Sequence, residues 1–213
     1  MTMRIAFICT SNLWGSALAE HTTRALLRDW GVDGEQVQVT SAGVRAQVGA
    51  PLPAVTQLVL AERGIDASGH AARWMTPELL AAGDLVLTMG AVQREAALAL
   101  HPRGLRSTFT VREAAALLQG LPPVVAPVAP EEGRHARAVV ATLAGARRFR
   151  VAPSGVDDLP DLLADDVRAV RALAEQLTRD VSALLRALVL PEFAARATTP
   201  ARMVVAPPVS AVA

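Results

Sequence analysis

The stretch RIAFICTSNLWGS, residues 4–16, decides the fold. After Arg4 it runs through apolar residues to Cys9, a pattern that predicts a short buried strand of a parallel sheet. Small and polar residues follow, as is typical of a loop, and helical periodicity then extends from Ala17 to Trp30. A buried strand, a small-residue loop and a helix N-terminus together form a recurrent anion site, because backbone N–H groups and the helix dipole favour negative charge.

Cys9 is the single cysteine of the chain, and its position leaves two interpretations open. A thiol at the start of such a loop is suited to act as a nucleophile in phosphoryl transfer, since the same field stabilises the thiolate. The alternative is that Cys9 is simply the small, buried last residue of a strand. One cysteine excludes an internal disulfide or a multi-cysteine metal site, and a lone thiol suits a reducing cytosol.

Composition narrows the class of protein further. The chain has 213 residues, of which 52% are hydrophobic, so one sizeable core is expected. Lys and Arg total 21 against 20 Asp and Glu, and this near-balance argues against nucleic acid as a partner. Neither a signal peptide nor a membrane-spanning stretch is visible, so we expect a soluble, cytoplasmic protein with no membrane partner.

Apolar runs and helical periodicities alternate along the chain, which predicts an α/β fold with a mainly parallel sheet. The N-cap of the first helix is assigned to Ser16. Strands are expected at 4–9, 37–43, 84–89 and 105–110, and helices at 17–30, 51–63, from 76 onward, 92–100, 111–118, 134–148 and 161–190.

Two proline-containing segments interrupt this pattern. Residues 121–130 are predicted to be a linker, and residues 194–213, rich in Ala, Val and Pro, a poorly ordered tail behind a domain of residues 1–193. The basic residues Arg147, Arg148 and Arg150 are interpreted as a solvated helix C-terminus. The four histidines show neither clustering nor metal-ligand spacing.

Residues 8–20, ICTSNLWGSALAE, resemble the phosphate-binding loop of the low-molecular-weight protein-tyrosine phosphatases, which reads Cys-x-Gly-Asn-x-Cys-Arg-Ser-Pro and continues to Ala-Glu. The resemblance extends over roughly residues 3 to 190. It implies a three-layer sandwich around a central, mainly parallel four-stranded sheet. The further segments that carry it are 41–43, 64–66, 76–80, 84–89 and 109–113, with Ser68, His70 and Arg73.

The resemblance also implies roles for individual residues. Cys9 matches the nucleophile that forms a phosphocysteine, Ser16 the hydroxyl that donates to its thiolate, and Asp158 the general acid. The acidic stretch around Asp158 is equally open to a plain reading as a loop with a helix cap. The residues expected to form the anion-binding loop are Thr10, Ser11, Asn12, Leu13, Trp14 and Gly15.

Several residues depart from the family pattern inside that loop. Gly15 stands where the family has an Arg that grips two phosphate oxygens, and losing such a donor typically lowers the rate by about 10²–10³. Trp14 replaces a second cysteine, and Gln93 stands where relatives often have a His. Arg45 and Arg73 are the candidate substitute cations, although surface solvation explains either.

The function expected from the resemblance is a cysteine-dependent phosphomonoester hydrolase of the phosphotyrosine type, weakened by Gly15. One alternative is a pseudophosphatase that binds a phosphoprotein or other anion without turnover. Another is a Cys9-dependent enzyme with a different electrophile. The expected partner is a phosphorylated protein or a small phosphate ester, and neither a metal nor a cofactor is required.

Overall fold

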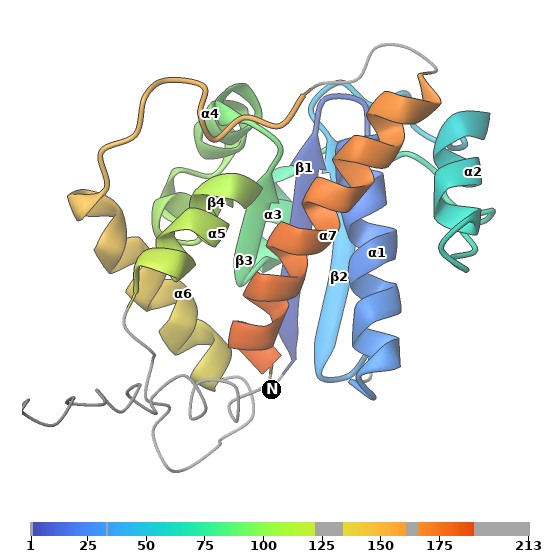
Figure 1. The fold of residues 1–213 in the computed structure, drawn as a ribbon. Helices are drawn as coiled ribbons and strands as arrows, with labels where there is room; N and C mark the ends of the chain where they lie inside the picture. Colours follow the sequence, from blue (N-terminus) through green and yellow to red (C-terminus); the bar gives the residue numbers. More distant parts are fainter. Residues whose placement is uncertain (1, 33, 122–133, 161–165, 190–213) are drawn as a thin grey trace, which may run out of the picture.

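Strand β1, Met3–Cys9, lies inside a parallel sheet with the strand order β2-β1-β3-β4 (Figure 1). The computed structural model describes residues 2–32, 34–121, 134–160 and 166–189. The other strands are β2 (Val37–Gly43), β3 (Leu85–Thr88) and β4 (Thr108–Thr110). The expected four-stranded parallel sheet is confirmed.

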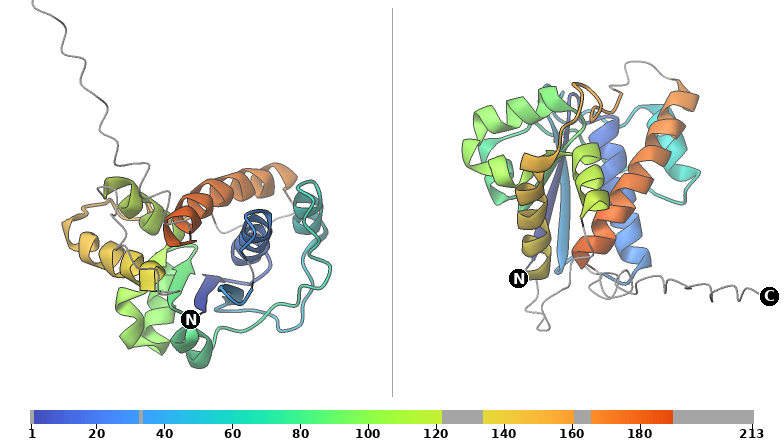
Figure 2. Two further views of the ribbon diagram at one scale, coloured as in Figure 1. Left: turned by 90° about the horizontal axis from the view of Figure 1, so that it is seen from below. Right: turned by 60° about the vertical axis from the view of Figure 1, so that its left-hand side comes forward.

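Helices cover both faces of this sheet, which gives three layers (Figure 2). In Figure 1, α1 and α7 lie in front of the strands. The helices are α1 (Gly15–Asp29), α2 (Ala54–Ala61), α3 (Pro77–Ala82), α4 (Ala91–Leu100), α5 (Val111–Gly120), α6 (Arg134–Ala146) and α7 (Val167–Val189), with short 3-10 turns η1 (Pro102–Arg106) and η2 (Arg147–Phe149).

The alternation of side chains along β1 divides the core in two. Ile5 and Phe7 belong to the larger cluster, which packs against helices that include α1 and α7. Ala6 and Ile8 belong to a smaller cluster with side chains of α3 and α4. Because both faces of β1 are covered, the strand is apolar nearly throughout, as its sequence predicts.

The end of β1 is a topological switch point of the sheet. Cys9 pairs with Gly43 of β2 on one side, and Ile8 pairs with Thr88 of β3 on the other. The chain therefore leaves β1 between two parallel strands whose connections run in opposite directions. Such carboxyl-end crevices are where open α/β sheets bind ligands.

Helix α7 buries its apolar face in the larger core cluster, next to α1 and α5, as the periodicity predicts. Val170, Leu173, Leu177 and Val181 are at most 2% exposed. The described helix begins at Val167, and the preceding Asp166 accepts hydrogen bonds from the first-turn amides of residues 168 and 169. The expected helical start at 161, the linker predicted at 121–130 except for its first residue, and the tail at 194–213 lie outside the described residues.

Arg147 corrects one expectation, because it is a structural link and not a solvated helix end. Its guanidinium binds Glu113 Oε1 at 2.7 Å and the carbonyl oxygens of Leu105 and Thr108 at 2.8 and 2.7 Å. It also lies 4.0 Å from the centroid of the Phe109 ring. One side chain thus joins η1, β4 and α5.

Within the described ranges no helix is long and apolar enough to cross a membrane.

Candidate active site

Cys9 lies at the carboxyl end of β1, directly below the start of α1, and is 3% exposed. Its sulfur accepts a hydrogen bond from the backbone N–H of Asn12 at 3.1 Å. The hydroxyl of Ser16 lies 2.8 Å from the same sulfur. The first N–H groups of a helix have no partner within it, and they present a partial positive charge near this thiol. The surroundings therefore suit a bound anion next to the sulfur.

Ser16 is not the N-cap of α1, so that assignment was wrong. The helix begins at Gly15 and its N-cap position is Trp14. Ser16 instead lies within the first turn, fully buried, where its hydroxyl is within 3.4 Å of the carbonyl oxygen of Ala42 as well as near Cys9. A side chain that looks like a helix cap thus contacts the candidate nucleophile.

Asn12 shapes the loop with a left-handed backbone (φ 61°) and a completely buried side chain. Its Nδ2 donates to Ser16 Oγ at 3.0 Å and to Ser41 Oγ at 2.7 Å. Its Oδ1 accepts from the backbone N–H of Arg73 at 2.8 Å. Its backbone oxygen lies 2.8 Å from His70 Nε2. A conformation that L-residues rarely adopt is thereby held from several directions.

The buried carboxylate of Glu20 stabilises the hydrogen-bond network around Asn12. Glu20 is 1% exposed and accepts a hydrogen bond from the hydroxyl of Ser41. Arg24 and Arg73 pair with Glu20 Oε1 at 2.7 and 3.3 Å, which compensates the buried charge. Arg73 is therefore occupied by this ion pair. Arg45, the second candidate cation, is exposed, and its backbone N–H donates to Thr10 O at 2.8 Å.

Gly43 allows β2 to approach the loop closely. A β-carbon at this position would lie 2.7 Å from the carbonyl oxygen of Thr10 and 2.8 Å from the backbone nitrogen of Asn12. Both are backbone atoms, which cannot move aside as a flexible side chain can. A residue without a side chain is therefore required where the sequence has Ser-Ala-Gly.

Gly15 is closely packed against Met89, which follows β3. A β-carbon on Gly15 would lie 2.8 Å from Met89 Sδ and 2.9 Å from Met89 Cγ. Met89 is 4% exposed and its backbone N–H donates to Ile8 O at 2.9 Å. The side of the loop where a longer residue would begin is thus filled by a flexible thioether side chain.

The two neighbouring aspartates have different surroundings. Asp157 forms a bidentate ion pair with Arg150, with N···O distances of 2.5 and 2.6 Å. This contact raises the pKa of Arg150 above its ordinary value. Asp158 turns toward α4, where its Oδ1 accepts from the backbone N–H of Ala91 at 2.7 Å. Its carbonyl oxygen lies 3.4 Å from Arg112 Nη1.

Asp158 is joined to the same edge of the sheet as Cys9. The next residue, Leu159, is buried and donates its backbone N–H to Met89 O at 2.7 Å. Met89 in turn contacts the first residue of α1. The acid-bearing segment and the cysteine loop therefore flank the end of β3.

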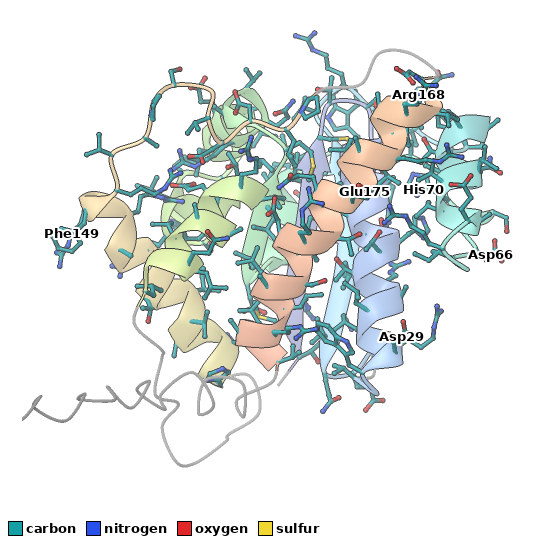
Figure 3. The ribbon with its side chains drawn as sticks, viewed as in Figure 1. Asp29, Asp66, His70, Phe149, Arg168 and Glu175 are labelled. Atoms are coloured by element: carbon teal, nitrogen blue, oxygen red, sulfur yellow. The ribbon has the colours of Figure 1, made fainter. Side chains whose placement is uncertain are left out.

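Two histidines that look unrelated in the sequence are neighbours, which corrects the expectation of no clustering. His21 Nε2 lies 3.2 Å from His70 Nδ1, and the ring centroids are 5.4 Å apart. Burial lowers the pKa of His21, while the nearby Glu20 opposes that shift. Figure 3 shows His70 on the side of α1 that faces α2. Among the described residues no three His, Cys, Asp or Glu side chains gather as a metal site.

Gln93 is a site residue whose contact the sequence does not reveal. It is 7% exposed, and its Nε2 donates to Thr10 Oγ1 at 2.9 Å. The two residues are 83 positions apart. The sequence indicates Gln93 only as a departure from the family pattern, and nothing in it indicates the contact with Thr10.

The comparison with known families agrees with this geometry. Residues 4–113 match the model of the low molecular weight phosphotyrosine protein phosphatases. The chain belongs to this family. Membership places it among phosphatase-type hydrolases. The matched segment of this phosphatase chain includes the whole cysteine loop and Gly43, and it ends before Asp158.

Individual relatives also support the assignment of this chain to a phosphatase family. The chain is 36% identical over 113 residues to a protein of Ralstonia solanacearum described as a probable low molecular weight protein-tyrosine-phosphatase, EpsP, covering 53% of this chain and 73% of the relative. It is 32% identical over 113 residues to a protein-arginine-phosphatase of Geobacillus stearothermophilus, covering 53% and 72%. A low molecular weight protein tyrosine phosphatase structure from T. tengcongensis superimposes with a TM-score of 0.63 at 26% identity, over 87% of this chain and 99% of the other.

Proposed function

We propose that this protein hydrolyses phosphate monoesters through a covalent phosphocysteine on Cys9. The observation that carries the proposal is the surroundings of the sulfur, which lies 2.8 Å from Ser16 Oγ and accepts from Asn12 N at 3.1 Å at the start of α1. A backbone N–H directed at the sulfur, with a hydroxyl within hydrogen-bond distance of it, suits a nucleophilic thiolate, the form that attacks phosphorus. The surrounding loop amides would hold the phosphoryl oxygens.

The reaction divides into two displacements at phosphorus. In the first, the Cys9 thiolate forms an S–P bond as the ester P–O bond breaks, and Asp158 gives its proton to the leaving oxygen. In the second, water forms a P–O bond as the S–P bond breaks, Asp158 takes a proton from the water, and the thiolate is restored. Oδ1 of Asp158 accepts from Ala91 N, which holds this carboxyl group at the start of α4.

Gly15 lowers the expected rate. The loop offers the phosphoryl group the helix dipole and backbone amides. The Arg side chain of the family pattern, which is a bidentate cation, is absent because Gly15 has only a hydrogen atom there. A charged bidentate contact strengthens as charge develops in the transition state, so its loss slows the chemical step more than it weakens binding. We therefore expect a slow phosphatase.

The substrate class follows from the relatives. Those described as protein-tyrosine-phosphatases and the protein-arginine-phosphatase support a phosphorylated protein as substrate, with phosphotyrosine as our first assignment. A small aryl phosphate would occupy the same loop. Phosphotyrosine and phosphoarginine peptides of one sequence would separate the two protein substrates.

Anion binding without turnover is the second candidate function. It is favoured by the close packing of Gly15 against Met89 and by the hydrogen bond that already engages Asp158 at the start of α4. Such a protein would bind vanadate or phosphate with the Cys9 loop and release no product.

Release of nitrophenolate from para-nitrophenyl phosphate tests the two functions against each other. The wild type should turn over, Cys9→Ser should be inactive, and Ser16→Ala should be slower because the hydroxyl beside the sulfur is lost. Binding of vanadate to all three proteins is measured in parallel by calorimetry. Vanadate binding to the wild type without Cys9-dependent release would replace the hydrolase by the binding function.

A further inference from the structure

Gln93 lies between the cysteine loop and the acid-bearing segment. It belongs to the first turn of α4, and its Nε2 is committed to Thr10 Oγ1, next to the candidate nucleophile. With the nitrogen fixed in this way, the amide oxygen remains to make a different contact.

Gly90 shows what that oxygen faces. A β-carbon on Gly90 would lie 3.1 Å from Gln93 Oε1 and 3.0 Å from Asp158 Oδ1. Both oxygens thus lie close to the Gly90 α-carbon and close to one another. The backbone of Gly90 is extended (φ −162°), which any residue adopts, so its conformation does not explain the glycine. The two oxygens packed beside it do, because they leave little room for a β-carbon.

Two acceptor oxygens that lie close together are stabilised by a donor that they share. A carboxylate only accepts hydrogen bonds, and the amide nitrogen of Gln93 is already used. A water molecule has two protons and satisfies both acceptors at once. This arrangement also fixes the direction of the water's lone pairs.

We propose that Gln93 and Asp158 together hold the water that hydrolyses the phosphocysteine, an inference that rests on the proposed function. The water oxygen bonds to phosphorus while the S–P bond breaks and its electron pair returns to Cys9. One water proton passes to Asp158, and the other stays in a hydrogen bond to Gln93 Oε1. Gln93 orients the reacting water and is itself unchanged, so its effect falls on the second step alone.

Rapid mixing with para-nitrophenyl phosphate separates the two steps. The burst of nitrophenolate reports formation of the phosphocysteine, and the later steady rate reports its hydrolysis. In Gln93→Leu the burst should keep its rate within about twofold, and the steady rate should fall by about 10–10². The phosphocysteine should accumulate, seen as the mass of one added phosphoryl group in acid-quenched protein.

Gly90→Ala is the second variant, since its methyl group would crowd both Gln93 Oε1 and Asp158 Oδ1. It should slow the steady rate more than the burst, because para-nitrophenolate needs little protonation in the first step. Val92→Ala, on the same helix turn with Val92 72% exposed, is the matched control and should leave both phases unchanged. Thermal unfolding of each variant confirms that it is folded.

The outcomes separate this inference from the function on which it rests. Equal slowing of burst and steady rate in Gln93→Leu, or no accumulated phosphocysteine in either variant, would overturn the role of Gln93 and leave the hydrolase standing. A wild type that gives a burst and then stops would overturn the role of Gln93 and the hydrolase together, because the phosphocysteine would form without being hydrolysed. A wild type without any Cys9-dependent release would remove the hydrolase and the role of Gln93 with it.

Discussion

Arg150 holds both carboxylate oxygens of Asp157, while the next residue, Asp158, turns away to the N-terminus of α4. Adjacent side chains on one segment thus have separate roles. The ion pair fixes the segment, and the second carboxylate is placed at the sheet edge where Cys9 lies. The pair of aspartates therefore offers a matched test of which carboxylate moves protons.

Asp158→Asn should lower kcat for phenyl phosphate by about 10²–10⁴, because an amide cannot protonate the leaving phenolate. The loss should be much smaller with para-nitrophenyl phosphate, whose leaving group needs little protonation. Asp157→Asn should keep the activity and lower the free energy of unfolding by about 1 kcal/mol, as expected for a partly exposed ion pair. Equal kinetic losses in the two variants would refute the assignment.

Gly15→Arg should raise kcat/KM for para-nitrophenyl phosphate by about 10², since it supplies the missing bidentate cation. The new side chain requires Met89 to move, because its β-carbon would lie 2.8 Å from the thioether sulfur. Gly15→Ala makes the same steric demand without the charge and should give no gain. A folded arginine variant that is no faster would show that the cation does not limit the rate.

Gly43→Ala should destabilise the protein by roughly 1–3 kcal/mol, because the methyl group overlaps backbone atoms of residues 10 and 12. Gly69→Ala is the control, as a β-carbon there would meet no described atom within 4 Å. Urea unfolding of the two variants and the wild type gives the comparison. Similar midpoints for both variants would argue against the close approach of β2 to the loop.

His21 should make stability depend on pH. Burial lowers its pKa below the ordinary value of 6.5, with Glu20 opposing and His70, Arg24 and Arg73 adding to the shift. As the pH falls, the unfolded chain therefore takes up the His21 proton at a higher pH than the folded protein does. The contribution of neutral His21 to the free energy of unfolding is complete above pH 6.5 and is lost as the pH falls through the lower folded pKa. His21→Gln should lose less stability over that range in urea unfolding. An unchanged pH profile in this variant would contradict the prediction.

Local sequence pattern predicted most of the architecture. The apolar runs gave the strands in order, and the periodicity of α7 identified its buried face. The last strand is shorter than expected because Pro102–Arg106 forms a 3-10 turn before it. Errors of this kind concern where an element begins, which competing local interactions decide.

The larger errors concern contacts between distant residues. Arg147 and Glu113 are 34 residues apart in the sequence, and His21 and His70 are 49 apart. The residues that flank each of them in the sequence therefore do not indicate its partner. For the same reason the loop motif suggested Cys9 and Ser16 but not Gln93. Residues that share a short motif are visible in a sequence, whereas residues that meet through the fold are not.

The contacts that hold Asn12 in its left-handed conformation also bear on how an anion would bind. A loop already fixed by Ser16, Ser41, Arg73 and His70 has few conformations left to lose, so an incoming oxyanion meets only a small entropic penalty. Affinity is then governed by charge and not by flexibility. The free and occupied loops should accordingly superimpose.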